Sequence, residues 1–116
     1  MEKTKTYKSI VAKINAHIRA NSTMGYVNYS RWYVGITNDV KIRKSKHNQT
    51  FPNNMYFQFF DAGTMDTANQ IEAHFSKNKG TINDSGKGGA KENSIYVYAF
   101  KAEPTWVEIL EDWLSE

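Results

Sequence analysis

Tyr33, Arg43 and His47 are the residues whose types and spacing could perform chemistry together. They lie in the segment WYVGITNDVKIRKSKH, in which a β-type run is followed by Asp39 and then by a short predicted helix. Arg43 and His47 are four residues apart and therefore share one face of that helix. Arginine presents a permanently charged planar fork, and histidine exchanges protons near neutral pH. This pair suits the binding of an anionic group and the transfer of a proton.

The same segment resembles the second half of the signature of the GIY-YIG nuclease family. That half is a tyrosine-aliphatic-glycine strand, matched by Tyr33-Val34-Gly35, and then a helix with an arginine and, one turn later, a histidine, matched by Arg43 and His47. The resemblance implies metal-assisted hydrolysis of a phosphodiester bond. In that reaction Arg43 would hold the scissile phosphate, and His47 would bond the phosphate or pass protons.

The first half of the family signature is a glycine-aliphatic-tyrosine strand. Its nearest match is Gly25-Tyr26, which lacks the intervening residue. A hairpin that turns at Tyr29-Ser30 would place Tyr26 opposite Tyr33, with both rings on one face of the sheet. The resemblance implies that one of these tyrosines acts as the general base, and Tyr29 is the second choice for the partner of Tyr33.

A metal ligand completes the set that the resemblance implies. Glu72 lies in the middle of a helix that follows a strong strand, which is where the family carries its metal-binding glutamate. One carboxylate together with water and phosphate oxygens is a usual shell for Mg²⁺, so we expect one Mg²⁺ or Mn²⁺ ion. The late asparagine of the family is matched by Asn93, with Asn83 as a competitor.

The charge of the chain favours a nucleic-acid partner, with DNA as our first expectation. The 116 residues carry a formal charge of +3 and a pI of about 9.1. The basic residues are clustered, whereas the acidic ones gather toward the C-terminus, so a basic face is expected to contact phosphates. The candidate phosphate contacts are Lys41, Lys44 and Lys46 around the predicted helix, and Lys87 and Lys91 in a glycine-rich loop.

Composition excludes several other classes. The absence of cysteine excludes disulfides and thiolate zinc sites. No basic start followed by a long apolar core indicates a signal peptide, and no run of eighteen apolar residues indicates a membrane span. We therefore expect a cytoplasmic protein without a membrane partner.

The sequence predicts a single domain over residues 1–116, with a GIY-YIG-like core over about 24–101. The fold class should be α+β, with a small and mainly antiparallel sheet of three to four strands flanked by helices. Helices are expected over about 5–20, 39–47, 66–77 and 105–115, strands over 24–28, 31–37, 55–60 and 94–100, and a long loop over 78–93.

Two other functions remain open at this point. A catalytically inactive relative would bind nucleic acid without cutting it, and the altered first half of the signature favours that reading. A protein-interaction domain would instead use the aromatic residues Trp106 and Trp113 of the last predicted helix. Salt-dependent affinity for DNA separates the first two functions from the third.

Overall fold

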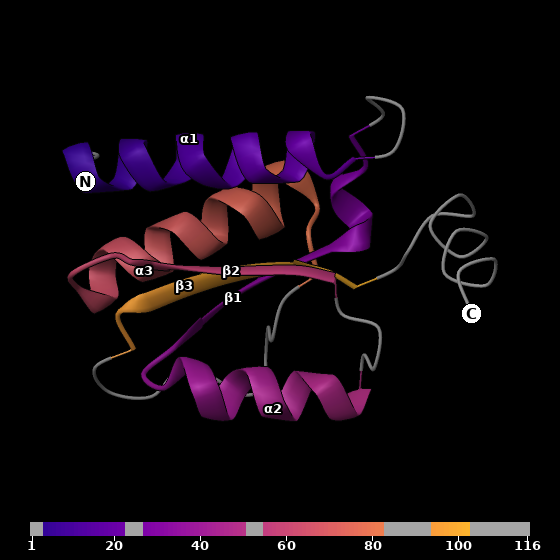
Figure 1. Cartoon of the computed structure of the whole chain (residues 1–116). Helices are drawn as coiled ribbons and strands as arrows, with labels where there is room; N and C mark the ends of the chain where they lie inside the picture. Colours follow the sequence, from indigo (N-terminus) through magenta and orange to yellow (C-terminus); the bar gives the residue numbers. More distant parts are fainter. Residues whose placement is uncertain (1–3, 23–26, 51–54, 83–93, 103–116) are drawn as a thin grey trace, which may run out of the picture.

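The computed structural model describes residues 4–22, 27–50, 55–82 and 94–102, and these form an α+β fold. A three-stranded antiparallel sheet lies between two helical layers (Figure 1). Helices α1 (Lys5–Ala20) and α3 (Met65–Ala73) lie on one side of the sheet, and α2 (Val40–Thr50) lies on the other. The fold class predicted from the sequence is confirmed. The last predicted helix lies outside the described residues.

The strands are β1 (Trp32–Thr37), β2 (Met55–Asp61) and β3 (Tyr96–Lys101). Their order in the sheet is β1-β3-β2, so the strand that comes last in the chain lies in the centre. Both ladders are antiparallel. The third predicted strand extends one residue further than expected, and the last starts two residues later.

The hairpin predicted to turn at Tyr29-Ser30 is wrong. Tyr29–Arg31 form a turn of 3₁₀-helix, because the side chain of Asn28 accepts a hydrogen bond of 3.1 Å from the backbone N–H of Ser30. Across the β1–β3 ladder, Tyr33 faces Phe100. The outer edge of β1 pairs with Ile82, which lies three residues after the π-helical segment His74–Lys79 that follows α3.

Helix α1 forms as the sequence predicts. Its apolar residues recur every three or four positions, and Tyr7, Ile10, Ile14 and Ile18 are buried. The hydroxyl of Thr4 accepts a hydrogen bond of 3.0 Å from the backbone N–H of Tyr7 and so caps the first turn. No helix within the described ranges is both long enough and apolar enough to cross a membrane.

Thr4→Ala is expected to lower the free energy of unfolding by about 1 kcal/mol, because it removes the side-chain acceptor of the N-cap. Thr6→Ala, at an exposed position in the first turn of the same helix, is the matched control. Alanine has a higher helix propensity than threonine, so the control should leave the free energy of unfolding unchanged or raise it by roughly a few tenths of a kcal/mol. Urea unfolding of the two variants and the parent measures both effects.

Helix α3 ends at Ala73 and continues as a π-helical segment, His74–Lys79, so the helical stretch ends two residues beyond the predicted end at 77. Gly80 ends this segment in the left-handed conformation, with φ of 83°, which a glycine adopts without steric cost. The residues directly after Gly80 run along the outer edge of β1: the N–H of Ile82 donates to the oxygen of Trp32 at 2.9 Å. The chain after α3 therefore returns to the sheet beside Tyr33.

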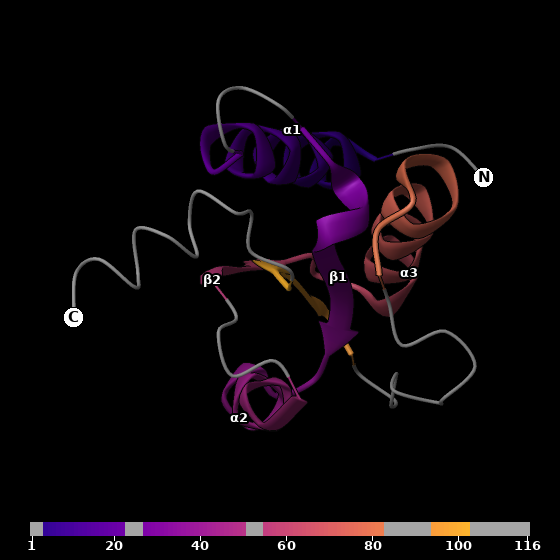
Figure 2. The same cartoon turned by 90° about the vertical axis from the view of Figure 1, so that its right-hand side faces the viewer.

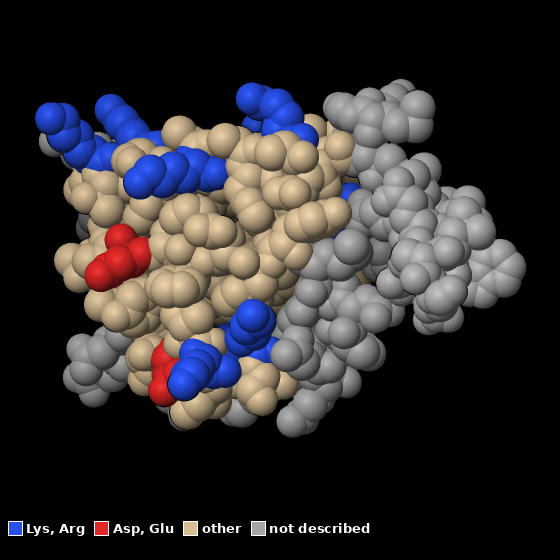
Figure 3. All heavy atoms as spheres, in the orientation of Figure 1, with Lys and Arg blue, Asp and Glu red and all other residues tan. Residues whose placement is uncertain are grey.

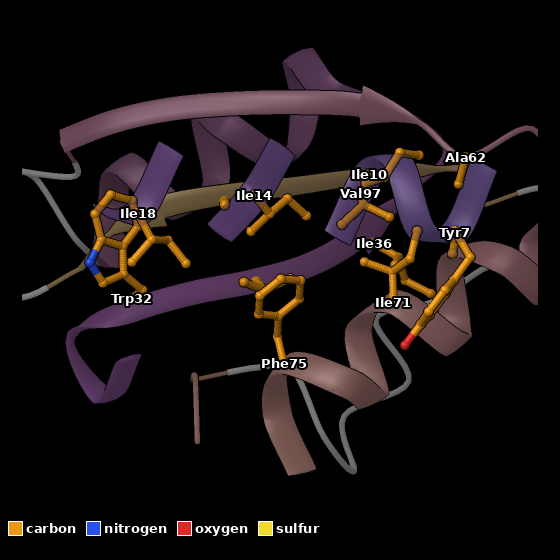
Figure 4. Close-up of a cluster of buried hydrophobic side chains, with 13 residues drawn as sticks. Tyr7, Ile10, Ile14, Ile18, Trp32, Ile36, Ala62, Ile71, Phe75 and Val97 are labelled. Atoms are coloured by element: carbon orange, nitrogen blue, oxygen red, sulfur yellow. The ribbon is translucent and has the colours of Figure 1, made fainter. Parts of the chain in front are cut away.

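The main core lies between the sheet and the two helices α1 and α3 (Figure 4). Ile14 and Ile18 from α1 and Phe75 from the π-helical segment after α3 are fully buried there. Seen along the sheet in Figure 2, α3 lies beside β1 while α1 covers the sheet from above. A second cluster occupies the face of the sheet on the α2 side, and it consists mainly of aromatic rings: Tyr33, Tyr98, Phe100 and Phe57, with Ala102 and Ile82.

Candidate functional site

The aromatic layer on the α2 side of the sheet contains the Tyr33 of the candidate signature. The ring of Tyr33 lies 5.0 Å from that of Phe100 and 6.0 Å from that of Tyr98, and the planes are within 9° and 11° of parallel. Phe57 of β2 continues the layer, with its centroid 5.7 Å from that of Tyr98. Side chains from all three strands thus form one nearly parallel set of rings.

Gly35 is the reason why the ring of Tyr98 can lie where it does. The two residues are direct partners in the β1–β3 ladder. A Cβ atom built on Gly35 would lie 2.6 Å from Cζ of Tyr98, and closer still to its hydroxyl oxygen. No side chain therefore fits at position 35 while Tyr98 keeps its place. The glycine of the tyrosine-aliphatic-glycine pattern brings a second tyrosine hydroxyl over the strand that carries Tyr33.

Helix α2 starts directly after β1 because a short turn holds the two elements together. The hydroxyl of Thr37, at the end of β1, accepts a hydrogen bond of 3.0 Å from the N–H of Asp39. The carboxylate of Asp39 then accepts one of 3.1 Å from the N–H of Ile42. The predicted N-cap at Asp39 is confirmed. Since the cap fixes where the helix begins, it also fixes where Arg43 stands relative to β1.

The side of α2 that carries Arg43 faces the aromatic layer. Nζ of Lys44 lies 5.2 Å from the centre of the Phe57 ring, and Arg43 is half-buried. On the outer side of the helix, Lys41 is exposed and Ile42 is 57% exposed. Position 47 follows Arg43 by one helical turn in α2, on the same face. The structure therefore places the side of α2 that carries basic residues opposite the aromatic layer of the sheet.

Glu72 lies in the helical layer on the other side of the sheet. It is half-buried on α3, next to the buried Ile71. His74 lies on the flank of this helix that meets α1, where its ring packs edge-on against that of Tyr7 at 6.2 Å. Two residues correspond to about 200° around a helix, so Glu72 lies on the opposite flank, away from α1. Helix α3 as a whole packs beside β1, the strand that carries Tyr33.

The other predicted site residues divide into two groups. Lys41 and Lys44 are exposed on α2, as contacts with phosphate would require. The remainder lie outside the described part of the structure: Tyr26, Lys87, Lys91, Asn93 and its competitor Asn83, together with the side chains of Lys46 and His47.

Tyr98 is the candidate residue that the sequence analysis missed. The alternation along β3 puts Tyr96, Tyr98 and Phe100 on one face of the strand, and this pattern is visible in the sequence. The sequence does not show, however, that β3 pairs with β1. Without knowing that β3 pairs with β1, nothing distinguishes Tyr98 from the other tyrosines of the chain.

Basic side chains outnumber acidic ones on the face of the molecule that Figure 3 shows. Figure 3 shows Lys and Arg side chains over α1 at the top and over α2 at the bottom, with few acidic side chains between them. The acidic residues within the described ranges are Asp39, Asp61, Asp66 and Glu72, and nowhere in those ranges do three His, Asp or Glu residues gather in a way that could hold a metal ion. Any metal site in this part of the chain therefore depends on few protein ligands.

Comparisons of the chain with protein-family models, with curated proteins and with solved structures give no match.

Proposed function

We propose that the chain is a GIY-YIG-like endonuclease domain that hydrolyses DNA phosphodiester bonds with the help of one Mg²⁺ or Mn²⁺ ion. One observation carries this proposal. Tyr33 and Tyr98 lie with parallel rings on one face of the sheet, and the Arg43 side of α2 faces the same layer. This arrangement supports the roles that the sequence resemblance implies for Tyr33 and Arg43.

The pair Tyr33 and Tyr98 supplies the two tyrosines that the family resemblance requires on one face. The resemblance pointed to Tyr26 as the partner of Tyr33, whereas Tyr98 lies beside it in the structure. We assign the general base to this pair: the oxygen of one tyrosine, in its phenolate form, takes a proton from the attacking water and becomes the neutral phenol. Tyr33 and Tyr98 are 3% and 0% exposed, and a base acts only within hydrogen-bond reach of that water, so under this proposal the layer between the sheet and α2 has to open to the phosphate.

Arg43 holds the phosphate in this proposal. Its guanidinium can donate two parallel hydrogen bonds to two phosphate oxygens, which orients the phosphate and offsets its charge. Lys41 and Lys44 on the same helix add sequence-independent attraction to the neighbouring phosphates of the backbone. His47, one turn after Arg43, is assigned to a hydrogen bond with the phosphate or to proton transfer, as the resemblance implies.

Glu72 is the proposed metal ligand. Its carboxylate is a hard oxygen donor, and one such carboxylate suits a Mg²⁺ or Mn²⁺ ion that keeps most of its water. When bound, such an ion neutralises charge on the phosphoryl oxygens and makes a coordinated water more acidic.

Incubation of the purified protein with supercoiled plasmid tests the proposal. We expect nicked and linear products with Mg²⁺ or Mn²⁺, and intact plasmid when EDTA removes the ion, because the reaction needs charge neutralisation at the phosphate. Parallel reactions with single-stranded DNA and RNA establish which nucleic acid is preferred.

The other outcomes point to the two remaining functions. If no nucleic acid is cut but affinity for DNA falls steeply with salt, the domain binds nucleic acid without catalysis. If the protein neither cuts nor binds nucleic acid, the nuclease proposal is wrong and a protein-interaction domain becomes the better reading.

A further inference from the structure

The outer face of α1 is a second basic surface, on the opposite side of the sheet from the candidate site. The buried residues Tyr7, Ile10, Ile14 and Ile18 turn one side of this helix toward the core. Every lysine and arginine of the helix is exposed, and the helix contains no acidic residue. Figure 3 shows these side chains projecting from the top of the molecule. They are Lys5, Lys8, Lys13 and Arg19.

The rest of this face is made of small side chains. Ser9, Ala12, Ala16 and Ala20 are exposed between the cationic residues. Small residues let an elongated partner approach the helix closely, so that the flanking cations can reach it. The large hydrophobic residues that are exposed in the described ranges, Ile42, Tyr56 and Phe59, belong to α2 and β2. The α1 face therefore lacks the apolar side chains with which an amphipathic helix enters a lipid surface.

The spacing of the cations fits the backbone of a nucleic acid. Lys5 and Arg19 are separated by about 21 Å along the helix axis, at about 1.5 Å per residue. One strand of a DNA duplex carries a phosphate about every 3.4 Å along its axis, so the face spans roughly six phosphates. Its exposed cations can each replace a counterion on such a strand.

We propose that the outer face of α1 binds a nucleic-acid backbone as a second surface, separate from the candidate site. The choice of a nucleic acid as the polyanion rests on the proposed function. Because α1 and α2 lie on opposite sides of the sheet, the α1 face points away from the site between α2 and the aromatic layer (Figure 1). One protein molecule then holds two separate segments of DNA, one on each side.

The salt dependence of DNA binding tests the first part of this inference. All proteins carry Glu72→Gln, so that the DNA remains uncut. The test variant adds Lys8→Gln, Lys13→Gln and Arg19→Gln, and the matched control adds Lys8→Arg, Lys13→Arg and Arg19→Lys. Glutamine keeps the helix propensity close to that of lysine and arginine. The slope of log affinity against log salt should fall by about 0.9 for each lost phosphate contact, or about 2.7 in total, and remain unchanged in the control.

Capture of a second duplex tests the simultaneous binding of two segments. A duplex fixed to beads is mixed with the protein and then with a labelled duplex. The Glu72→Gln protein and the charge-conserving control should retain the label, whereas the glutamine variant should bind the beads but retain several-fold less label.

The outcomes separate this inference from the proposed function. If the glutamine variant keeps its fold but loses all affinity for DNA, the α1 face is the main DNA-binding surface and the inference of two separate surfaces is wrong. If the slope and the retained label match those of the control, the inference is wrong, whether or not the parent cuts DNA.

Discussion

Glu72→Gln is expected to lower the rate of metal-dependent DNA cleavage about a hundredfold or more, while the affinity for DNA stays close to that of the parent. Charge neutralisation by a metal ion at a phosphoryl oxygen contributes several kcal/mol to the transition state. Each loss of about 1.4 kcal/mol is a tenfold loss of rate. The amide keeps the size of the side chain and removes the negative charge that holds the ion. Plasmid nicking under single-turnover conditions gives the rate, and fluorescence anisotropy gives the affinity.

Asp66→Asn is the matched control for this variant. Asp66 is an exposed acidic residue in the first turn of the same helix, so the substitution makes the same change of charge without touching the proposed ligand position. The control should cut DNA at the parent rate and lose only a few tenths of a kcal/mol (roughly) of stability from the helix dipole. Equal cleavage by parent, Glu72→Gln and control would assign the metal to other residues or the activity to a contaminant.

Gly35→Ala is expected to lower the free energy of unfolding by about 1–3 kcal/mol, the range for overpacking in a well-packed core. The new Cβ would overlap the end of the Tyr98 ring, which is fully buried and lies against the rings of Tyr33, Phe57 and Phe100. A ring held on several sides cannot move away cheaply. Urea unfolding measures the loss, and cleavage should fall with it, because the hydroxyl of Tyr98 is displaced.

A double-mutant cycle isolates the contact between position 35 and position 98. Tyr98→Ala alone leaves a cavity and is expected to cost about 3–5 kcal/mol. In Gly35→Ala with Tyr98→Ala the overlap no longer exists, so the combined loss should be smaller than the sum by about 1 kcal/mol or more. Strictly additive losses would show that the cost of Gly35→Ala arises from the backbone of β1 and not from Tyr98.

Most of the helices and strands that the structure describes could be predicted because their signals are local. The apolar period of α1 and the carboxylate of Asp39 before α2 are contained within a few residues of sequence. The same holds for the alternation along β3, whose residues Val97 and Ala99 pack into the main core while Tyr98 and Phe100 join the aromatic layer. These features depend on backbone geometry that every chain shares.

The pairing of the strands could not be predicted in this way. Tyr33 meets Phe100 and Tyr98, which are far away in sequence, and no local pattern specifies such a partner. The expected hairpin assumed that neighbouring segments pair, and the side chain of Asn28 stabilises a 3₁₀ turn at that point instead. The positions of Arg43 and Tyr33 in the candidate site follow from one continuous segment, whereas the second tyrosine depends on the topology of the sheet.

The burial of Lys101 is a further consequence of topology. Its side chain is 2% exposed, Nζ donates a hydrogen bond of 3.1 Å to the carbonyl oxygen of Asn21, and the ring of Trp32 lies 6.0 Å away. A lysine at the end of a strand is expected to be exposed. Because β3 is the central strand, both of its neighbours enclose its ends, and the carbonyl after α1 provides the partner that a buried ammonium requires.

The central position of β3 also determines when the sheet can form during synthesis on the ribosome. β1 and β2 pair with β3 and not with each other, so neither has a ladder partner among the strands until residues 96–101 have left the exit tunnel. Until then the central strand that separates β1 from β2 is missing, and their aromatic side chains cannot pack against it. Closing such long loops costs chain entropy before any pairing is gained, which makes this step slow. The nascent chain therefore presents two apolar, unpaired strands from the emergence of β2 until that of β3, which is the kind of surface that chaperones bind.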